Sequence, residues 1–411
     1  MCGIASRHPE TARLLPDKIR EPNREVLVFS NLTPARRFRL AGHGRAVGTA
    51  GRLRLWCAHY EAKGPHPLPG HPAGRSPAGA GARRRAWRAV DVSVVRWGIV
   101  GPGRIAERFA SDLRRVPNAR LVAVASRSLA TAEAFVARHG AGRACAGYQQ
   151  LFDDEEVDAV YIATPHTLHA SQSRAAIAAG KAVLCEKPLT VSPDECRDLQ
   201  HYARSERRYL VEGMWTWFLP AIRKAREWID TGRIGRVRHI RADFGYPLPY
   251  DPRGREYDSA LAGGCLLDMG IYPVALARLV FGEQPARLEV LHHLAPNGVD
   301  DDVVALCGYD DRTAILAASF RCKLPNCAYL VGEEGHIAIP DFWRADSCHL
   351  YELDERKDSF RDDRQGTGFE FEIAAVSADI LAGRLESATV TAADSLAFQL
   401  HMAQIKAQFG P

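Results

Sequence analysis

The feature that most constrains the fold is a regular alternation of apolar strand patterns and helical patterns, which begins at Val94 and continues to Cys185. Strands joined by helices need right-handed crossovers, which produce a parallel sheet covered by helices on both faces. The pattern therefore predicts an α/β fold that begins with a doubly wound (Rossmann) sheet. Strands are expected at 94–100, 121–125, 157–163 and 181–185, with helices at 104–116, 129–139 and 171–179.

The pattern changes after about residue 211, where a long helix at 221–231 precedes a segment, 237–244, that alternates with period two. Such alternation predicts a C-terminal α+β domain with an open, mostly antiparallel sheet, and Asp310-Asp311 is expected to form a hairpin turn. The domains are predicted at 94–213 and 214–394, followed by a C-terminal helix at 395–411. Further strands are expected at 287–294, 303–309, 314–321, 328–331 and 336–339, and closing helices at 369–382 and 395–409 are expected to pack back on the first domain.

Residues 1–93 differ from the rest of the chain. They contain about 17 Lys and Arg against about 6 Asp and Glu, so the net charge of +5 conceals a mildly acidic remainder. The stretch 65–88 is dominated by Gly, Pro, Ala, His and Arg, a composition that buries too little apolar surface to offset ordering entropy. Three interpretations stay open: a non-native leader, a disordered tail or a targeting segment.

Composition also excludes some partners. No apolar run approaches the roughly 18–20 residues that span a membrane, and the acidic body does not suggest a nucleic-acid surface. The ten cysteines are scattered singly and lack metal-site spacing. We therefore expect reduced thiols, a cytoplasmic protein, no metal, and a small-molecule ligand instead of nucleic acid or membrane.

A glycine-rich turn follows the first strand. Gly101-Pro102-Gly103-Arg104-Ile105-Ala106 matches the pattern G-x-G-x-x-(G/A), in which Gly101 allows a tight turn and Gly103 lets the backbone approach a pyrophosphate. The free N–H groups of Arg104 and Ile105 at the helix N-terminus would hold the phosphates. With a strand before it and a helix after it, the turn predicts a bound dinucleotide.

The end of the second predicted strand indicates which dinucleotide is bound. Sites specific for NAD place an acidic residue there, whereas this chain has Ser126-Arg127-Ser128. A hydroxyl and a guanidinium can bind a 2′-phosphate that an acidic residue would repel. The sequence predicts NADP, with NAD still possible if Arg127 only stacks on the adenine.

A lysine then follows the strand 181–185, in the tripeptide Glu186-Lys187-Pro188. A lysine at the carboxyl end of a parallel strand lies beside the ligand crevice, where its ammonium can stabilise developing negative charge on a substrate oxygen. Together with the glycine turn, Lys187 indicates a nicotinamide-dependent oxidoreductase.

These motifs resemble the glucose–fructose oxidoreductase and inositol dehydrogenase family (Gfo/Idh/MocA), most closely its dihydrodiol and NADP-dependent xylose dehydrogenase branch. The resemblance covers residues 94–411. It rests on the glycine turn, 163–169 (ATPHTLH), 186–188 (EKP), 263–273 (GGCLLDMGIYP) and 368–372 (GFEFE), with 212–218 (EGMWTWF) favouring the branch. It implies that Thr164, His166, His169, Glu186, Lys187 and Pro188 lie at the cofactor, the last often after a cis bond. His169 could instead be a core histidine.

The resemblance also places Tyr272 where many family members carry a proton-transferring histidine. Tyr272 can act as general acid or base if a nearby cation, such as Lys187, lowers its pKa from about 10. Asp268, four residues earlier, would orient both. In the alternative, Tyr272 only hydrogen-bonds the substrate and Lys187 relays the proton.

Two tryptophans, Trp215 and Trp217, are candidates for an aromatic wall of the substrate pocket, although they suit interdomain core equally well. The expected activity is hydride transfer between NADP and a carbinol carbon of a sugar, polyol or trans-dihydrodiol. Two alternatives stay open: a catalytically silent NADP-binding sensor, and an enzyme that oxidises a sugar transiently before bond cleavage. The open sheet is expected to join a homodimer.

Overall fold

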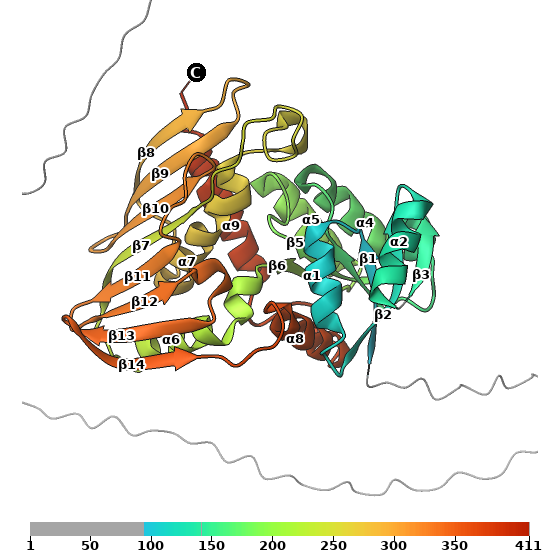
Figure 1. The fold of residues 1–411 in the computed structure, drawn as a ribbon, viewed down its shortest axis with the longest axis horizontal. Coiled ribbons are helices and arrows are strands. Elements are labelled where there is room, and N and C mark those ends of the chain that lie inside the picture. The colour runs from blue at the N-terminus through green and yellow to red at the C-terminus, as the bar shows by residue number, and fades with distance from the viewer. Residues whose placement is uncertain (1–93, 141, 411) are drawn as a thin grey trace, which may run out of the picture. The chain divides into compact units, whose positions relative to one another are not determined.

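The computed structural model describes residues 94–140 and 142–410, so the predictions for residues 1–93 lie outside the described residues. Within them the chain forms a parallel six-stranded sheet followed by an eight-stranded, mostly antiparallel sheet (Figure 1). This architecture confirms the predicted fold class.

The first sheet has the strand order β3-β2-β1-β4-β5-β6, and every neighbouring pair is parallel. The order reverses between β1 and β4, so the carboxyl ends of these strands border the crevice where such sheets bind ligands. The strands are β1 (Val95–Val100), β2 (Ala119–Ser126), β3 (Arg143–Ala146), β4 (Ala159–Ile162), β5 (Ala182–Glu186) and β6 (Leu210–Gly213). The helices are α1 (Arg104–Leu113), α2 (Leu129–His139), α3 (Tyr148–Phe152), α4 (His169–Ala178) and α5 (Pro193–Ser205).

Helix α5 was not anticipated by the apolar pattern, yet its start is well marked in the sequence. The Ser192 hydroxyl accepts a hydrogen bond from the Glu195 amide at 3.2 Å, and Pro193 occupies the first helical position. Strand β3 was also missed, because four residues are too few to establish a period.

The second sheet has the order β14-β13-β12-β11-β7-β10-β9-β8, in which only β7 and β10 pair in parallel. The expected hairpin at Asp310-Asp311 joins β9 to β10. Strands β13 and β14 were not expected, and β14 consists mostly of charged residues. The strands are β7 (Val237–Gly245), β8 (Arg287–Leu294), β9 (Asp300–Gly308), β10 (Thr313–Ser319), β11 (Cys327–Gly332), β12 (His336–Pro340), β13 (Ser347–Glu352) and β14 (Glu355–Arg361).

Helices cover one face of this sheet: α6 (Pro220–Asp230) packs on β12, β13 and β14, and α7 (Ile271–Phe281) on β7 and β10. The run Ser259–Phe281, which includes α7, is long and apolar enough to cross a membrane, with a mean hydropathy of 1.5. The expectation that no apolar run reaches this length is therefore wrong for this segment. Its most apolar window is 72% buried inside the protein, as expected of a core helix.

The two C-terminal helices pack differently. Helix α8 (Phe369–Leu381) packs on α1 and on β1 of the first domain, where Trp97 Nε1 donates a hydrogen bond to Ser377 Oγ at 3.1 Å. Helix α9 (Ala392–Lys406) packs on both α5 and α7, and Thr391 and Asp394 form its capping box. Both helices thereby connect the second domain to the first.

Candidate active site

A cleft of about 740 Å³ opens at the carboxyl ends of β1, β4 and β5 and is closed on its other side by the second domain. Ten of the residues predicted from the sequence line it: Gly103, Arg104, Ile105, Thr164, His166, His169, Glu186, Lys187, Asp268 and Tyr272. Six others do not contribute to its lining: Gly101, Ser126, Arg127, Pro188, Trp215 and Trp217.

The two glycines of the turn have different surroundings. Gly101 has φ +89°, and a Cβ there would lie 2.7 Å from Thr164 Cγ2 and 3.0 Å from the Ala163 carbonyl oxygen. Gly103 caps α1 with φ −93°, and a Cβ there would meet nothing within 4 Å. The turn therefore needs Gly101 for its own packing, whereas Gly103 leaves open space in front of the helix N-terminus. That space fits the pyrophosphate of a dinucleotide.

Ser126 is the last residue of β2 and Arg127 follows it, exposed. The Gly101 amide donates a hydrogen bond to the Ala125 carbonyl at 3.1 Å, which holds the end of β2 beside the glycine turn. The two segments expected to hold one dinucleotide are therefore neighbours in the fold.

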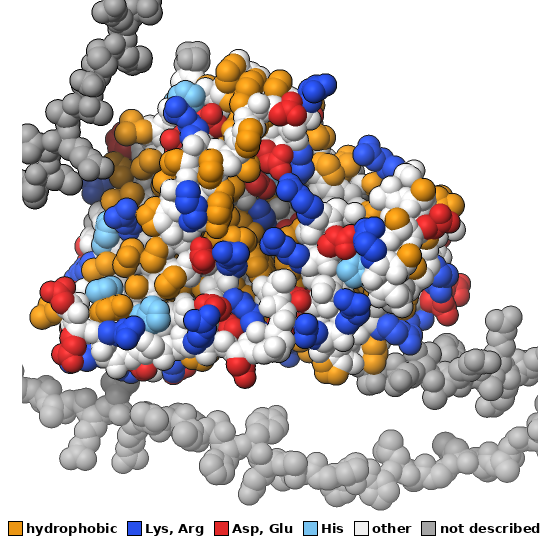
Figure 2. All heavy atoms as spheres, viewed as in Figure 1, with side chains coloured by type: hydrophobic (Ala, Val, Ile, Leu, Met, Phe, Trp, Pro, Cys, Tyr) orange, Lys and Arg blue, Asp and Glu red, His pale blue; other side chains and the backbone are white. Residues whose placement is uncertain are grey.

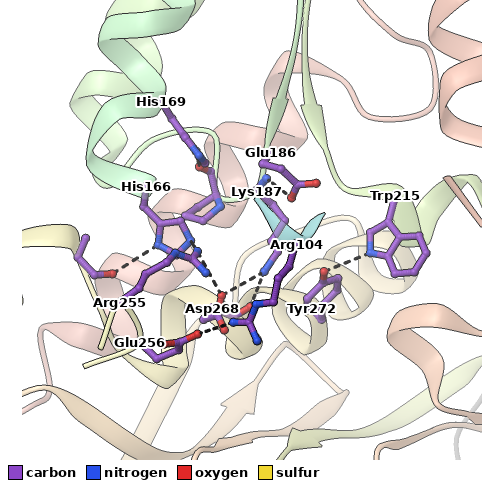
Figure 3. Close-up of polar contacts among 12 residues, drawn as sticks. Arg104, His166, His169, Glu186, Lys187, Trp215, Arg255, Glu256, Asp268 and Tyr272 are labelled. Atoms are coloured by element: carbon purple, nitrogen blue, oxygen red, sulfur yellow. Dashed lines mark hydrogen bonds and ion pairs between the residues drawn. The ribbon is translucent and has the colours of Figure 1, made fainter. Parts of the chain in front are cut away.

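Lys187 reaches from the end of β5 to Asp268, 81 residues away in the sequence (Figure 3). Its ammonium donates a hydrogen bond to the Asp268 carbonyl at 2.6 Å and lies 3.7 Å from carboxylate oxygen Oδ1. Burial favours the neutral acid, but the cations Lys187 and Arg255 outweigh it and hold the pKa of Asp268 below its ordinary value. The carboxylate is thus kept ionised beside the lysine.

Tyr272 lies in the first turn of α7, just after a π-helical turn at Leu266–Gly270 that carries Asp268. The Lys187 ammonium lies over its ring, 4.7 Å from the centroid, and the hydroxyl instead accepts a hydrogen bond from Trp215 Nε1 at 3.1 Å. Burial, and then the charge of Glu186, raise the pKa of Tyr272 well above 10. The expectation that Lys187 lowers this pKa is therefore wrong, because the cation faces the ring and not the oxygen.

His166 contacts a loop of the second domain (Figure 3). Arg255 Nη2 lies 2.9 Å from His166 Nε2, and because a guanidinium can only donate, Nε2 must be unprotonated. The ring proton is then on Nδ1, 3.4 Å from the Ala262 carbonyl oxygen. Burial and the neighbouring Arg255 lower the pKa of His166 to about 3, in agreement with a neutral ring.

Sequence reasoning missed Arg255 as a site residue. No motif contains it, because it lies in the irregular loop between Tyr246 and Tyr257. The same loop carries Glu256, whose carboxylate pairs with Arg104 of the glycine turn at 3.0 Å. Two consecutive residues of the second domain therefore contact two predicted cofactor-binding segments of the first.

His169 is fully buried behind His166. Its Nδ1 lies 2.7 Å from the Pro188 carbonyl oxygen and its Nε2 lies 2.8 Å from that of Thr164. The Lys187–Pro188 bond is cis, as the resemblance implied. Burial lowers the pKa of His169 to about 4 although both carbonyls oppose the shift. His169 thus connects the segment after β4 to the segment after β5.

Glu186 points away from solvent and receives hydrogen bonds from the Tyr161 hydroxyl and, at 3.2 Å, from the Lys187 amide. Burial raises its pKa, although the charge of Lys187 opposes the shift. Its side chain therefore supports the turn from which Lys187 extends.

The prediction that Trp215 and Trp217 form the pocket wall is wrong. Trp215 stacks on Phe369 with centroids 4.6 Å apart and lies behind Tyr272, while Trp217 packs edge-on against Phe398. The short helix Trp215–Phe218 turns both rings into the contact with α8 and α9. They are interdomain core, the alternative that the sequence left open.

The aromatic wall comes instead from the second sheet. Phe244, at the end of β7, stacks on Trp343 with centroids 4.7 Å apart and a 17° angle, and both rings line the cleft. Tyr246, Leu248 and Met269 extend this apolar surface. No sequence motif points to Trp343, which lies about 100 residues beyond β7. Within residues 94–140 and 142–410, no group of three or more His, Cys, Asp or Glu side chains could hold a metal ion.

Comparisons with known proteins agree with this geometry. The family model described as "Oxidoreductase family, NAD-binding Rossmann fold" matches residues 95–214, and the model "GFO/IDH/MocA C-terminal domain" matches residues 222–338. Trans-1,2-dihydrobenzene-1,2-diol dehydrogenase of Danio rerio is 33% identical over 326 residues, which cover 77% of this chain and 97% of that protein. The enzyme of the same name from Mus musculus is 39% identical over 256 residues, covering 61% and 75%.

Among solved structures, KijD10, a 3-ketoreductase from Actinomadura kijaniata in complex with NADP, aligns with a TM-score of 0.66 and 28% identity, covering 76% of this chain and 97% of that chain. An aldose-aldose oxidoreductase from Caulobacter crescentus aligns with a TM-score of 0.70, 23% identity and the same coverage, and shows the fold alone.

Proposed function

The chain belongs to the GFO/IDH/MocA oxidoreductase family, and on that premise we propose that it is an NADP-dependent dehydrogenase of a sugar or a trans-dihydrodiol. The observation that carries the proposal is the meeting of Lys187, Asp268 and Tyr272 in one cleft with the open glycine turn. The trans-dihydrodiol named for the curated relatives suits an apolar cleft with one charged end.

A bound nicotinamide supplies the hydride chemistry in such enzymes. This chain's residues supply charge and orientation. The Lys187 ammonium donates to the substrate oxygen and stabilises its negative charge, while Asp268 holds the ammonium at the strand end. Because the pKa of Tyr272 lies well above 10, its phenol stays protonated and donates a hydrogen bond to the same oxygen. Proton transfer is therefore assigned to Lys187, with Tyr272 in support: the ammonium gives a proton to the carbonyl oxygen during reduction, and the neutral amine takes the hydroxyl proton during oxidation.

The preference for NADP rests on Ser126 and Arg127 at the end of β2, neither of them acidic, and on the NADP bound to the related KijD10. In Arg127→Ala, we expect the KM for NADP to rise about 10- to 100-fold while that for NAD stays within about 2-fold, because only NADP carries the 2′-phosphate. Equal increases for both cofactors would instead mean that Arg127 stacks on the adenine.

We also propose that the protein is a homodimer joined through the open face of the second sheet. Exposed apolar side chains lie on β8, β9 and β11, with Leu291 74%, Leu306 47% and Tyr329 38% exposed. Figure 2 shows hydrophobic side chains gathered over these strands, with basic and histidine side chains among them. Such a patch on a soluble protein favours association. Leu291→Glu with Leu306→Glu should give a monomer in light scattering, and an unchanged mass would refute this interface.

The function is tested by following NADP reduction by absorbance across aldoses, inositols and trans-dihydrodiols. Turnover of one class by the wild type, with Lys187→Met impaired more severely than Tyr272→Phe, would support the proposal. Tight binding of NADPH without turnover of any substrate would contradict it and favour a sensor.

A further inference from the structure

The polar end of the cleft contains two cations that share one carboxylate. Lys187 Nζ and Arg255 Nη2 each lie 3.7 Å from Asp268 Oδ1. Asp268 thus lies between the lysine assigned to the reacting oxygen and a second strong donor from the loop of the second domain. Figure 3 shows Arg255 between His166 and Asp268, beside Lys187.

Arg255 has N–H groups that its contacts with the described residues do not use. Of its five N–H groups, the contact with His166 uses one, and the described residues provide no hydrogen-bond acceptor for Nε or Nη1. Its side chain is 45% exposed and lines the cleft. His166, through its bond at Nε2, and Asp268 fix the guanidinium in place, so the free N–H groups are held in the cleft before any ligand arrives.

The separation of the Lys187 and Arg255 nitrogens fits two neighbouring oxygens of one substrate. Because both cations lie 3.7 Å from one atom, their nitrogens are at most about twice that distance apart. Vicinal oxygens on a ring are roughly 3 Å apart, and each would lie about 2.9 Å from its own nitrogen. The ring that carries the oxygens would then face the apolar surface of Phe244 and Trp343.

We propose that Arg255 is a specificity-determining residue that anchors the non-reacting oxygen of a vicinal diol, while Lys187 binds the reacting one. This inference rests on the proposed dehydrogenase function and adds a residue to it. A hydroxyl accepts readily from a guanidinium, and a substrate that lacks it leaves these pre-positioned donors without a partner on the substrate.

The test compares matched substrates on matched variants. The substrates are trans-cyclohexane-1,2-diol and cyclohexanol, or an aldose and its 2-deoxy form, assayed with NADP. The variants are Arg255→Gln and, as control, Arg253→Gln, which changes an arginine of the same loop that is 92% exposed and lies 3.8 Å from Asp251. Thermal melting and NADPH fluorescence titration establish that each variant is folded and binds cofactor.

We expect Arg255→Gln to lower kcat/KM for the diol about 10- to 100-fold and for the mono-alcohol less than about 3-fold, so that the wild-type preference disappears. Arg253→Gln should retain the preference. Equal losses on both substrates would overturn the proposal and make Arg255 a residue that only positions His166 and Asp268. No loss on either would also overturn it. If the wild type turns over neither substrate class, the dehydrogenase function itself fails, and that outcome is separate because it does not involve the variant.

Discussion

The two walls of the cleft are built in different ways. The first domain contributes residues from three successive strand ends, β1, β4 and β5, each followed at once by its functional side chains. The second domain contributes Phe244, Arg255, Asp268 and Trp343 from a strand, a loop, a π-helical turn and a short helix. In the first wall, every functional segment directly follows the end of a parallel strand, whereas the segments of the second wall share no common pattern.

The two walls also differ in which part of the ligands they would contact. In the proposed function, the glycine turn and Lys187 of the first wall hold the cofactor and the reacting oxygen, which every substrate of this reaction type shares. The aromatic surface and Arg255 of the second wall would contact the remainder of the substrate. Loops vary more freely than strand ends in a parallel sheet, so a family can change substrates while retaining its cofactor site.

The largest effect is expected at Lys187, where the two walls meet. Lys187→Met should lower kcat by about 1000-fold or more while the Kd for NADPH changes little, because a charged donor to the reacting oxygen is lost. Single-turnover kinetics would measure this. Lys181→Met is the matched control, since Lys181 lies just before the other end of β5 and its ammonium donates to the Asp154 and Val157 carbonyls. A similar loss of kcat in both variants would argue against a catalytic role.

A smaller effect is expected at Tyr272, on the second wall. Tyr272→Phe should lower kcat about 100-fold, because the ring under Lys187 remains while the phenol that accepts from Trp215 is lost. Since burial raises the pKa of Tyr272 well above 10, the alkaline limb of the wild-type rate profile below pH 10 should remain in the variant. Disappearance of that limb would show that Tyr272 titrates as the base.

The glycine turn allows a prediction within the first wall. Gly103→Ala should raise the Kd for NADPH about 10-fold with the melting temperature nearly unchanged, because its Cβ enters the open space in front of α1. Gly101→Ala should instead destabilise the fold by about 1–3 kcal/mol, because φ is +89° and Thr164 is in the way. Titration and thermal melting of both variants distinguish the two roles, and a reversed pattern would refute this assignment.

An effect on stability alone, and none on kcat, is expected at Glu212, which lies behind the first wall and accepts a hydrogen bond from the Leu189 amide at 2.8 Å. Burial raises the pKa of Glu212 from 4.5 to about 7. The folded state therefore holds this proton more tightly than the unfolded state, and stability should fall as pH rises from 4.5 to 7. Relative to the wild type, Glu212→Gln should gain on the order of 3 kcal/mol between pH 5 and pH 8. Urea unfolding measures the difference, and exposed Glu206→Gln should show none.

The sequence could predict the first wall because its determinants are local. Alternation of strands and helices implies crossovers, and the carboxyl-end rule then places the glycine turn and Lys187 at one edge. The positions of Asp268 and Tyr272 came from the motif between residues 263 and 273. Strand β14 was not anticipated because its charged, mostly exposed residues give no apolar period, and the short, mixed sequence of β13 does not establish one.

By itself, the sequence determined the fold class, the dinucleotide crevice and the identity of the central lysine, since each depends on residues close together in the chain. Only the tertiary structure decided which aromatic rings face the cleft, which way Lys187 approaches Tyr272 and that Arg255 belongs to the site. Trp215 and Trp343 illustrate the reason. Both rings are large and apolar, but only packing between distant segments determines that one becomes core and the other becomes wall.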